Sequence, residues 1–236
     1  MRPAHARPVA LLALALAALQ AGCTPRAVIP DDERARVRQA LDGQSRYLRV
    51  AVTVHPLFGD GSRKLLLDAP AAEVDLLRGG QGEVIAPPPA ERILPPGTPA
   101  RIQKVEFPTG LLIAGRVVMT PRYHPWAYLA VAGEPRPCVL VLSQTAATAD
   151  DVLAEVDRVL AADDPSPALR ALPAEQHDAV LKKELVEGMA VGAVEMAWGQ
   201  PERRRIDRPN GTEEWSWPGG KRRASFQDEK LVRWVK

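Results

Sequence analysis

The sequence predicts an α+β protein in two parts: a β-rich barrel or sandwich, then a small ααβββ domain. Three observations predict this class. The 23 prolines favour turns and short strands over long helices. Between residues 46 and 142, turn signals separate short β-branched runs at roughly ten-residue spacing. After residue 165, the apolar spacing follows first the helical period and then the period of two that strands have.

The first 22 residues predict an export signal. Arg2 and Arg7 precede Val9–Leu19, an uninterrupted apolar run. This run is shorter than the roughly 20 residues that a helix needs to span a bilayer, as is typical of a signal peptide. Arg2 and Arg7 also account for the net charge of +2. The remaining chain is therefore neutral, which predicts no nucleic-acid partner.

Cys23 follows the small residues Ala21 and Gly22, which a signal peptidase needs. The pattern resembles the lipobox of bacterial lipoproteins, although Gln20 stands where that family prefers leucine. The resemblance implies lipidation of Cys23 and a membrane as partner. Because Thr24 follows the cysteine, it also implies the periplasmic face of the outer membrane, with the inner membrane as the alternative. The other interpretation is an ordinary secretory signal with Cys23 as an incidental thiol.

Residues 23–30 predict a tether and residues 31–164 a β-rich domain with flanking helices. Asp31–Leu41 has acidic residues first and basic residues last, an arrangement that suits the helix dipole. Cys138 lies in an apolar run and is expected to be a buried small hydrophobe without a disulfide partner. The predicted strands cover residues 47–54, 64–67, 73–77, 82–86, 100–107, 111–119, 126–132 and 138–142.

Thr148 predicts the start of a helix, because Asp151 stands at the spacing of a capping box. The prolines at residues 165 and 167 then predict a domain boundary, with the second domain at 165–236. Helices are expected over residues 175–187 and 190–198, and strands over residues 202–208, 212–217, 221–227 and 230–235. Asn210-Gly211 predicts a tight hairpin in which both residues have positive φ.

The second domain resembles the SmpA/OmlA family, also called the BamE-like lipoprotein domain. The resemblance covers about residues 174–236, a quarter of the chain. Its family pattern stands here as Gly188-Met189, Val194, Gly199-Gln-Pro201, Gly211, Trp215-Ser-Trp217 and Phe226–Val232. Ala190 and Glu229 depart from the family's helix cap and turn glycine. The resemblance implies a scaffold or adaptor in the cell envelope that supports outer-membrane assembly or integrity.

No residue pattern predicts a catalytic site, a metal site or a cofactor. His55 and His124 each precede proline in loop-like sequence, and neither belongs to a cluster with metal-ligand spacing. We therefore expect a non-enzymatic protein with an envelope protein as partner. Candidate interaction residues are the aromatic and basic side chains of three short runs, namely Tyr123, Trp126, Arg203, Arg204, Arg205, Trp215 and Trp217.

Two alternatives remain open. The run of residues 93–102 faintly resembles the turn and strand of SH3-like barrels, which would suit a peptidoglycan- or small-ligand-binding module. An enzyme that uses His55, His124 and a carboxylate is the second alternative. For the aromatic run around Trp126, and for Trp215 and Trp217, a structural role in the core competes with a role in binding.

Overall fold

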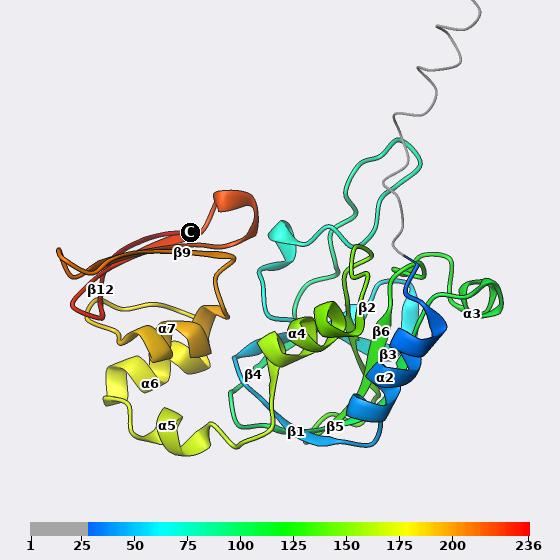
Figure 1. Ribbon diagram of the computed structural model, residues 1–236, viewed down its shortest axis with the longest axis horizontal. Coiled ribbons are helices and arrows are strands. Elements are labelled where there is room, and N and C mark those ends of the chain that lie inside the picture. The colour runs from blue at the N-terminus through cyan, green and yellow to red at the C-terminus, as the bar shows by residue number, and fades with distance from the viewer. Residues whose placement is uncertain (1–27) are drawn as a thin grey trace, which may run out of the picture.

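The computed structural model describes residues 28–236, so the predicted leader, Cys23 and most of the predicted tether lie outside the described residues. The described chain forms two units with separate apolar cores (Figure 1). One unit is built on an eight-stranded sheet and the other on a four-stranded sheet, which confirms the predicted α+β class. Among the described helices, none has the length and apolar character required to cross a bilayer.

The first unit combines two long helices and two short helical segments with eight strands. In chain order these are α2 (Asp31–Leu41), β1 (Ser45–Leu48), β2 (Val52–Leu57), β3 (Asp60–Leu67), η2 (Ala71–Glu73), β4 (Arg92–Leu94), β5 (Pro99–Glu106), α3 (Gly110–Gly115), β6 (Trp126–Val131), β7 (Cys138–Val141), α4 (Ala149–Val159) and β8 (Leu160–Ala161). The strand order is β4-β2-β3-β7-β6-β5-β1-β8, and only β3 and β7 run parallel. The edge strands β4 and β8 do not pair with each other, so the sheet is open and curled rather than the barrel or sandwich that we predicted.

Both faces of this sheet are apolar, and helices cover one face while a long loop covers the other. Leu66 and Leu129 pack on one face with helices α2 and α4. Leu65 and Tyr128 pack on the other face, together with Val74 from the long connection between β3 and β4. Because alternate residues of a strand point to opposite faces, both sets must be covered.

The second unit consists of three helices followed by a four-stranded antiparallel meander. Its elements are α5 (Ser166–Arg170), α6 (Ala174–Leu181), α7 (Val191–Trp198), β9 (Arg203–Asp207), β10 (Thr212–Ser216), η3 (Pro218–Gly220), β11 (Arg223–Gln227) and β12 (Lys230–Val235). Helices α6 and α7 lie below one face of the sheet (Figure 1). Side chains of α6, α7, β10 and β11 form the core between the helices and the sheet. No layer of described residues covers the opposite face of the sheet.

Several predicted elements differ from the structure. The predicted strand 47–54 is divided between β1 and β2, because Ala51 N–H donates to Met196 C=O of α7 (2.7 Å) instead of a neighbouring strand. Residues 73–77 and 82–86 are not strands but parts of a loop, in which Val74 and Leu76 cover the sheet while Val84 is 49% exposed. The predicted strand 111–119 is the short helix α3 followed by a turn, with most of its apolar side chains exposed.

Two differences concern the second unit. The predicted helix 175–187 ends with α6 at Leu181, because Lys183 adopts a positive φ of 56°. The connection between β9 and β10 has four residues, since Asp207 pairs with Thr212. Only Gly211 of this loop has positive φ, so the predicted two-residue Asn-Gly turn was wrong.

Candidate interaction surface

The outer face of the four-stranded sheet carries a cluster of four arginines. Strand pairing sets Arg203 opposite Ser216, Ser216 opposite Arg223, and Arg223 opposite Val235. Directly paired residues of neighbouring strands point to the same face. The intervening residues, Trp215 and Ala224, are buried against the helices. The row that contains Arg203 therefore points away from the core.

A second row lies beside the first. It sets Arg205 opposite Glu214, Glu214 opposite Ser225, and Ser225 opposite Arg233. Neighbouring strands are about 4.8 Å apart, so the two rows form a patch about 14 Å wide from β9 to β12. We call Arg203, Arg205, Arg223 and Arg233 the arginine face.

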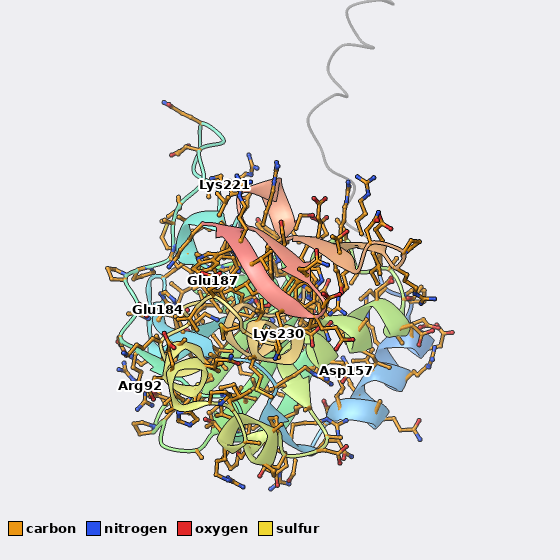
Figure 2. The ribbon with its side chains drawn as sticks, turned by 90° about the vertical axis from the view of Figure 1, so that its left-hand side faces the viewer. Arg92, Asp157, Glu184, Glu187, Lys221 and Lys230 are labelled. Carbon is orange, nitrogen blue, oxygen red and sulfur yellow. The ribbon has the colours of Figure 1, made fainter. Side chains whose placement is uncertain are left out.

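The arginine face is strongly positive. Its two rows hold four arginines and one carboxylate, Glu214. All four arginines are exposed, and none of them forms an ion pair with another described residue. Figure 2 shows Lys221 at the top of this unit and the acidic residues Glu184 and Glu187 lower down. The face therefore offers several guanidinium groups without an ion pair among the described residues, and guanidinium groups bind carboxylates or phosphates in bidentate geometry.

The other candidate residues of this unit lie on the inner side. Trp215 and Trp217 are each 1% exposed, so their rings offer no surface to a partner and serve as core. The indoles of Trp198 and Trp217 meet edge to face with centroids 5.2 Å apart. Arg204 stacks 4.4 Å from the Trp215 ring and pairs with Glu195 of α7. Arg204 thus closes the rim of the core and does not belong to the arginine face.

The aromatic run of the first unit has a mainly structural position. Trp126 is 1% exposed, and its indole N–H donates to Pro121 C=O (3.0 Å). Tyr123 is half-buried, and its hydroxyl accepts a hydrogen bond from Arg122 (3.1 Å). Tyr123 lines a cleft of about 1120 Å³ between the β3–β4 connection and the residues that precede β6. Arg78, His124 and Ser143 also line this cleft.

The two histidines lie in separate surroundings. The Nδ1–H of His55 donates to Pro88 C=O (2.7 Å), and the Nδ1–H of His124 donates to Leu142 C=O (2.8 Å). A carbonyl can only accept, so both Nδ1 atoms carry the proton. Burial lowers the pKa of His124, which favours its neutral form. Among residues 28–236, no group of three or more His, Cys, Asp or Glu side chains could hold a metal ion.

Lys183 joins the two units. Its ammonium donates to the carbonyl groups of Ala51, Asp68 (3.0 Å) and Ala197 (3.0 Å). Two of these carbonyls belong to the first unit and one to α7. Burial lowers the pKa of Lys183 to about 8. The positive φ of Lys183 ends α6 and turns its side chain into this joint.

Arg222 forms a second link across the same joint. Its side chain is 3% exposed, pairs with Glu73 of the first unit (2.9 Å) and donates to Trp198 C=O (3.2 Å). The guanidinium also lies against the rings of Trp198 and Trp217, with centroid distances of 5.3 and 5.2 Å. A charge that is buried in this way requires its partners, so the ion pair makes the contact between the units specific.

Sequence reasoning identified half of the arginine face. It named Arg203 and Arg205 but not Arg223 and Arg233, which come from other strands. The alternation in residues 223–227 was visible, yet only the strand register shows that it aligns with Arg203. Comparisons with protein-family models, with curated proteins and with solved structures find no match for this chain.

Proposed function

We propose that this protein is a lipid-anchored lipoprotein of the bacterial envelope, on the periplasmic face of the outer membrane. In this proposal it acts as a non-enzymatic adaptor in outer-membrane assembly or integrity. Its second unit binds an acidic segment of an envelope protein through the arginine face. The observation that carries the proposal is this face, which is positive and uncovered by described residues.

The arrangement of the second unit supports the SmpA/OmlA part of the proposal. The resemblance implies two helices followed by an antiparallel meander, with the paired aromatic residues inside. Trp215 and Trp217 lie in the core, and Gly199 has the positive φ (80°) that ends α7 before Pro201. The additional short helix α5 and the fourth strand are compatible with the same layout.

Electrostatics give the adaptor proposal a measurable form. An acidic segment that pairs with exposed arginines associates faster at low salt. At 0.1 M salt the attraction between exposed charges more than about 10 Å apart is largely screened. We therefore expect binding to the partner to weaken steeply as the ionic strength rises.

Cross-linking of the membrane-extracted protein tests this proposal. We expect the native protein to capture an envelope protein, and Arg233→Glu to reduce the captured amount about tenfold at low salt. Arg170→Glu is the matched control, because Arg170 is an exposed arginine of α5 without an ion pair among the described residues. Equal capture by both variants, or no capture by the native protein, would contradict the adaptor function.

Lipidation is tested separately. Cells grown with radiolabelled palmitate should label the protein, and Cys23→Ser should abolish the label. An unlabelled native protein would remove the anchor from the proposal.

The cleft in the first unit favours a second candidate function, the binding of peptidoglycan or a small ligand. Its volume is about 1120 Å³, and its polar lining includes Arg122, His124 and Thr145. The open sheet gives no support to an SH3-like form of this candidate. Co-sedimentation of the full chain with purified peptidoglycan, and its loss in Arg122→Glu, would support this alternative over the adaptor.

A further inference from the structure

We propose that residues 110–119 form a membrane-contacting wedge, which rests on the lipid surface that holds the anchor. This inference depends on the proposed function, because it takes the lipid on Cys23 as its starting point. The wedge comprises α3 and the turn that follows it.

The wedge presents apolar side chains to solvent, although Val117 and Met119 also lie against Gly59 of the hairpin between β2 and β3. Leu111 is 89% exposed, Val118 67%, Met119 50% and Val117 43%. Single exposed apolar residues are common on proteins, but a contiguous group marks an interaction site. These four residues lie within nine consecutive positions, on one short helix and the turn that follows it.

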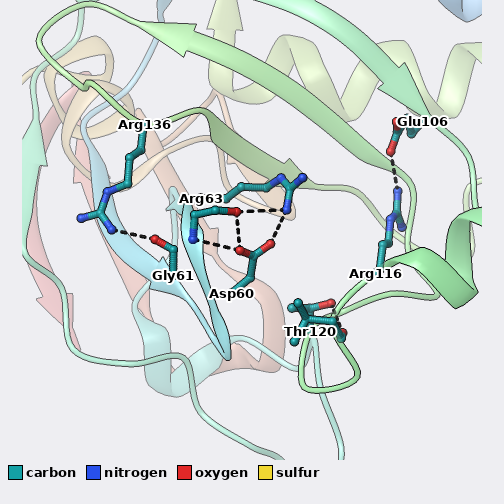
Figure 3. Close-up of polar contacts among 9 residues, drawn as sticks. Asp60, Gly61, Arg63, Glu106, Arg116, Thr120 and Arg136 are labelled. Atoms are coloured by element: carbon teal, nitrogen blue, oxygen red, sulfur yellow. Dashed lines mark hydrogen bonds and ion pairs between the residues drawn. The ribbon is translucent and has the colours of Figure 1, made fainter.

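Polar contacts connect the wedge to the rest of the first unit, and Figure 3 shows the contact between Arg116 and Glu106 together with Thr120. The Arg116 guanidinium pairs with Glu106 (3.4 Å) and donates to the carbonyl groups of Arg122 (3.1 Å) and His124 (2.8 Å). It also stacks 3.8 Å from the Trp126 ring.

The turn itself is closed by Thr120. Its backbone N–H and its hydroxyl both donate to Val117 C=O, at 3.1 and 2.7 Å. The exposed residues Val118 and Met119 are therefore held at the tip of a hydrogen-bonded turn. Arg116 at its base is 8% exposed, so the polar groups that fix the wedge are inside while its apolar groups are outside.

The position of the wedge indicates lipid as its partner. Val28 and Ile29, where the described chain begins, line a small cavity of about 130 Å³ together with Phe107, Pro108 and Ile113 of the wedge and its base. Cys23 precedes Val28 by five residues in the sequence. Five residues span at most about 17 Å. A lipid on Cys23 would therefore hold the bilayer within reach of the wedge.

Charge near the wedge also suits a bacterial membrane. Residues 107–123 contain no aspartate or glutamate, and their basic side chain outside the buried Arg116–Glu106 pair is Arg122, which is half-buried. Apolar residues in a segment without negative charge can enter the boundary between headgroups and acyl chains, where anionic lipids attract basic residues. A protein groove is the competing partner, and the experiment below separates the two.

A fluorescent probe at the tip of the wedge tests the proposal. In Val118→Cys, the probe is attached to the new thiol of the lipidated protein in vesicles of phosphatidylethanolamine and phosphatidylglycerol. Cys138 is fully buried and does not compete for the reagent. Ile206→Cys is the matched control, since Ile206 is 56% exposed but lies in β9 of the second unit.

We expect lipid-borne quenchers to reduce the fluorescence of the probe at residue 118 at least threefold more than that of the probe at residue 206. Equal quenching at both sites would overturn the wedge while leaving the anchor in place. A change at residue 118 that requires added envelope protein would overturn lipid contact in favour of a protein partner.

The unlipidated Cys23→Ser chain separates the two proposals. If Cys23 carries no lipid in cells, the anchor is refuted. The Cys23→Ser chain then tests whether the wedge binds lipid without it. A probe at residue 118 that shifts to shorter emission wavelength as vesicles are added would then support the wedge. An unchanged spectrum at saturating lipid would reject it.

Discussion

The turn between β11 and β12 contains conformational strain that a single substitution should relieve. Gln227 pairs with Lys230, so Asp228 and Glu229 alone connect the strands, with φ values of 49° and 62°. A two-residue hairpin of this kind requires positive φ at both positions and favours glycine at the second. The SmpA/OmlA resemblance also implies glycine where Glu229 stands. We therefore predict that Glu229→Gly stabilises the protein.

The magnitude follows from two opposing terms. A left-handed conformation costs an L-residue about 1–2 kcal/mol, and glycine avoids this cost. Glycine in turn loses about 0.5–1 kcal/mol more backbone entropy on folding. The Glu229 side chain is exposed and forms no ion pair among the described residues, so its removal adds no further loss. The expected net gain is about 0.5–1 kcal/mol.

Urea unfolding monitored by tryptophan fluorescence measures this gain, because Trp198, Trp215 and Trp217 lie in the core of the same unit. Glu214→Gly is the control, since it makes the same chemical change in β10, where φ is not positive. We expect the control to lose about 1 kcal/mol. If Glu229→Gly destabilises the protein as much as Glu214→Gly does, the strain argument is wrong.

Three further predictions concern buried groups. The pKa of Lys183 is lowered to about 8, so the unfolded chain binds more protons between pH 8 and 10.5, and the free energy of unfolding should rise there by up to about 3 kcal/mol relative to Lys183→Met. Urea titrations of both proteins across this pH range measure the difference, and a flat or falling difference would refute it. Arg116→Met should lower the free energy of unfolding in urea by about 3 kcal/mol, because two carbonyl groups lose their buried partner. A loss below 1 kcal/mol would contradict the stabilising role of Arg116. Burial raises the pKa of Cys138 to about 12, so the native protein should not react with a thiol reagent. The denatured lipoprotein should show one reactive thiol, and two would mean that Cys23 is unmodified.

The elements with strong local signals were predicted closely. The helix predicted over residues 31–41 is α2, and the capping box at Thr148 is present at the start of α4. The strands after residue 202 follow the predicted alternation, with shifts of one or two residues at four of their eight ends. In these cases the hydrogen bonds or the core face are set by residues close in the sequence.

The errors arose where distant residues decide the structure. Leu111 and Val74 lie in similar apolar runs, yet one is exposed on the wedge and the other covers a sheet. Periodicity cannot separate these outcomes in short runs. The end of α6 at Leu181 depends on Lys183, which binds carbonyl groups of the other unit, and the arginine face depends on strand register. Both features depend on residues that are distant in the sequence, so no local pattern predicts them.

The links made by Lys183 and Arg222 have a mechanical consequence. They tie backbone and side chains of both units together at two buried points. Bending between the units would expose an ammonium and a guanidinium that the joint now satisfies. The orientation of the second unit relative to the first is therefore fixed. A protein bound to the four-stranded sheet would be held at a defined distance and angle from the surface that the first unit contacts.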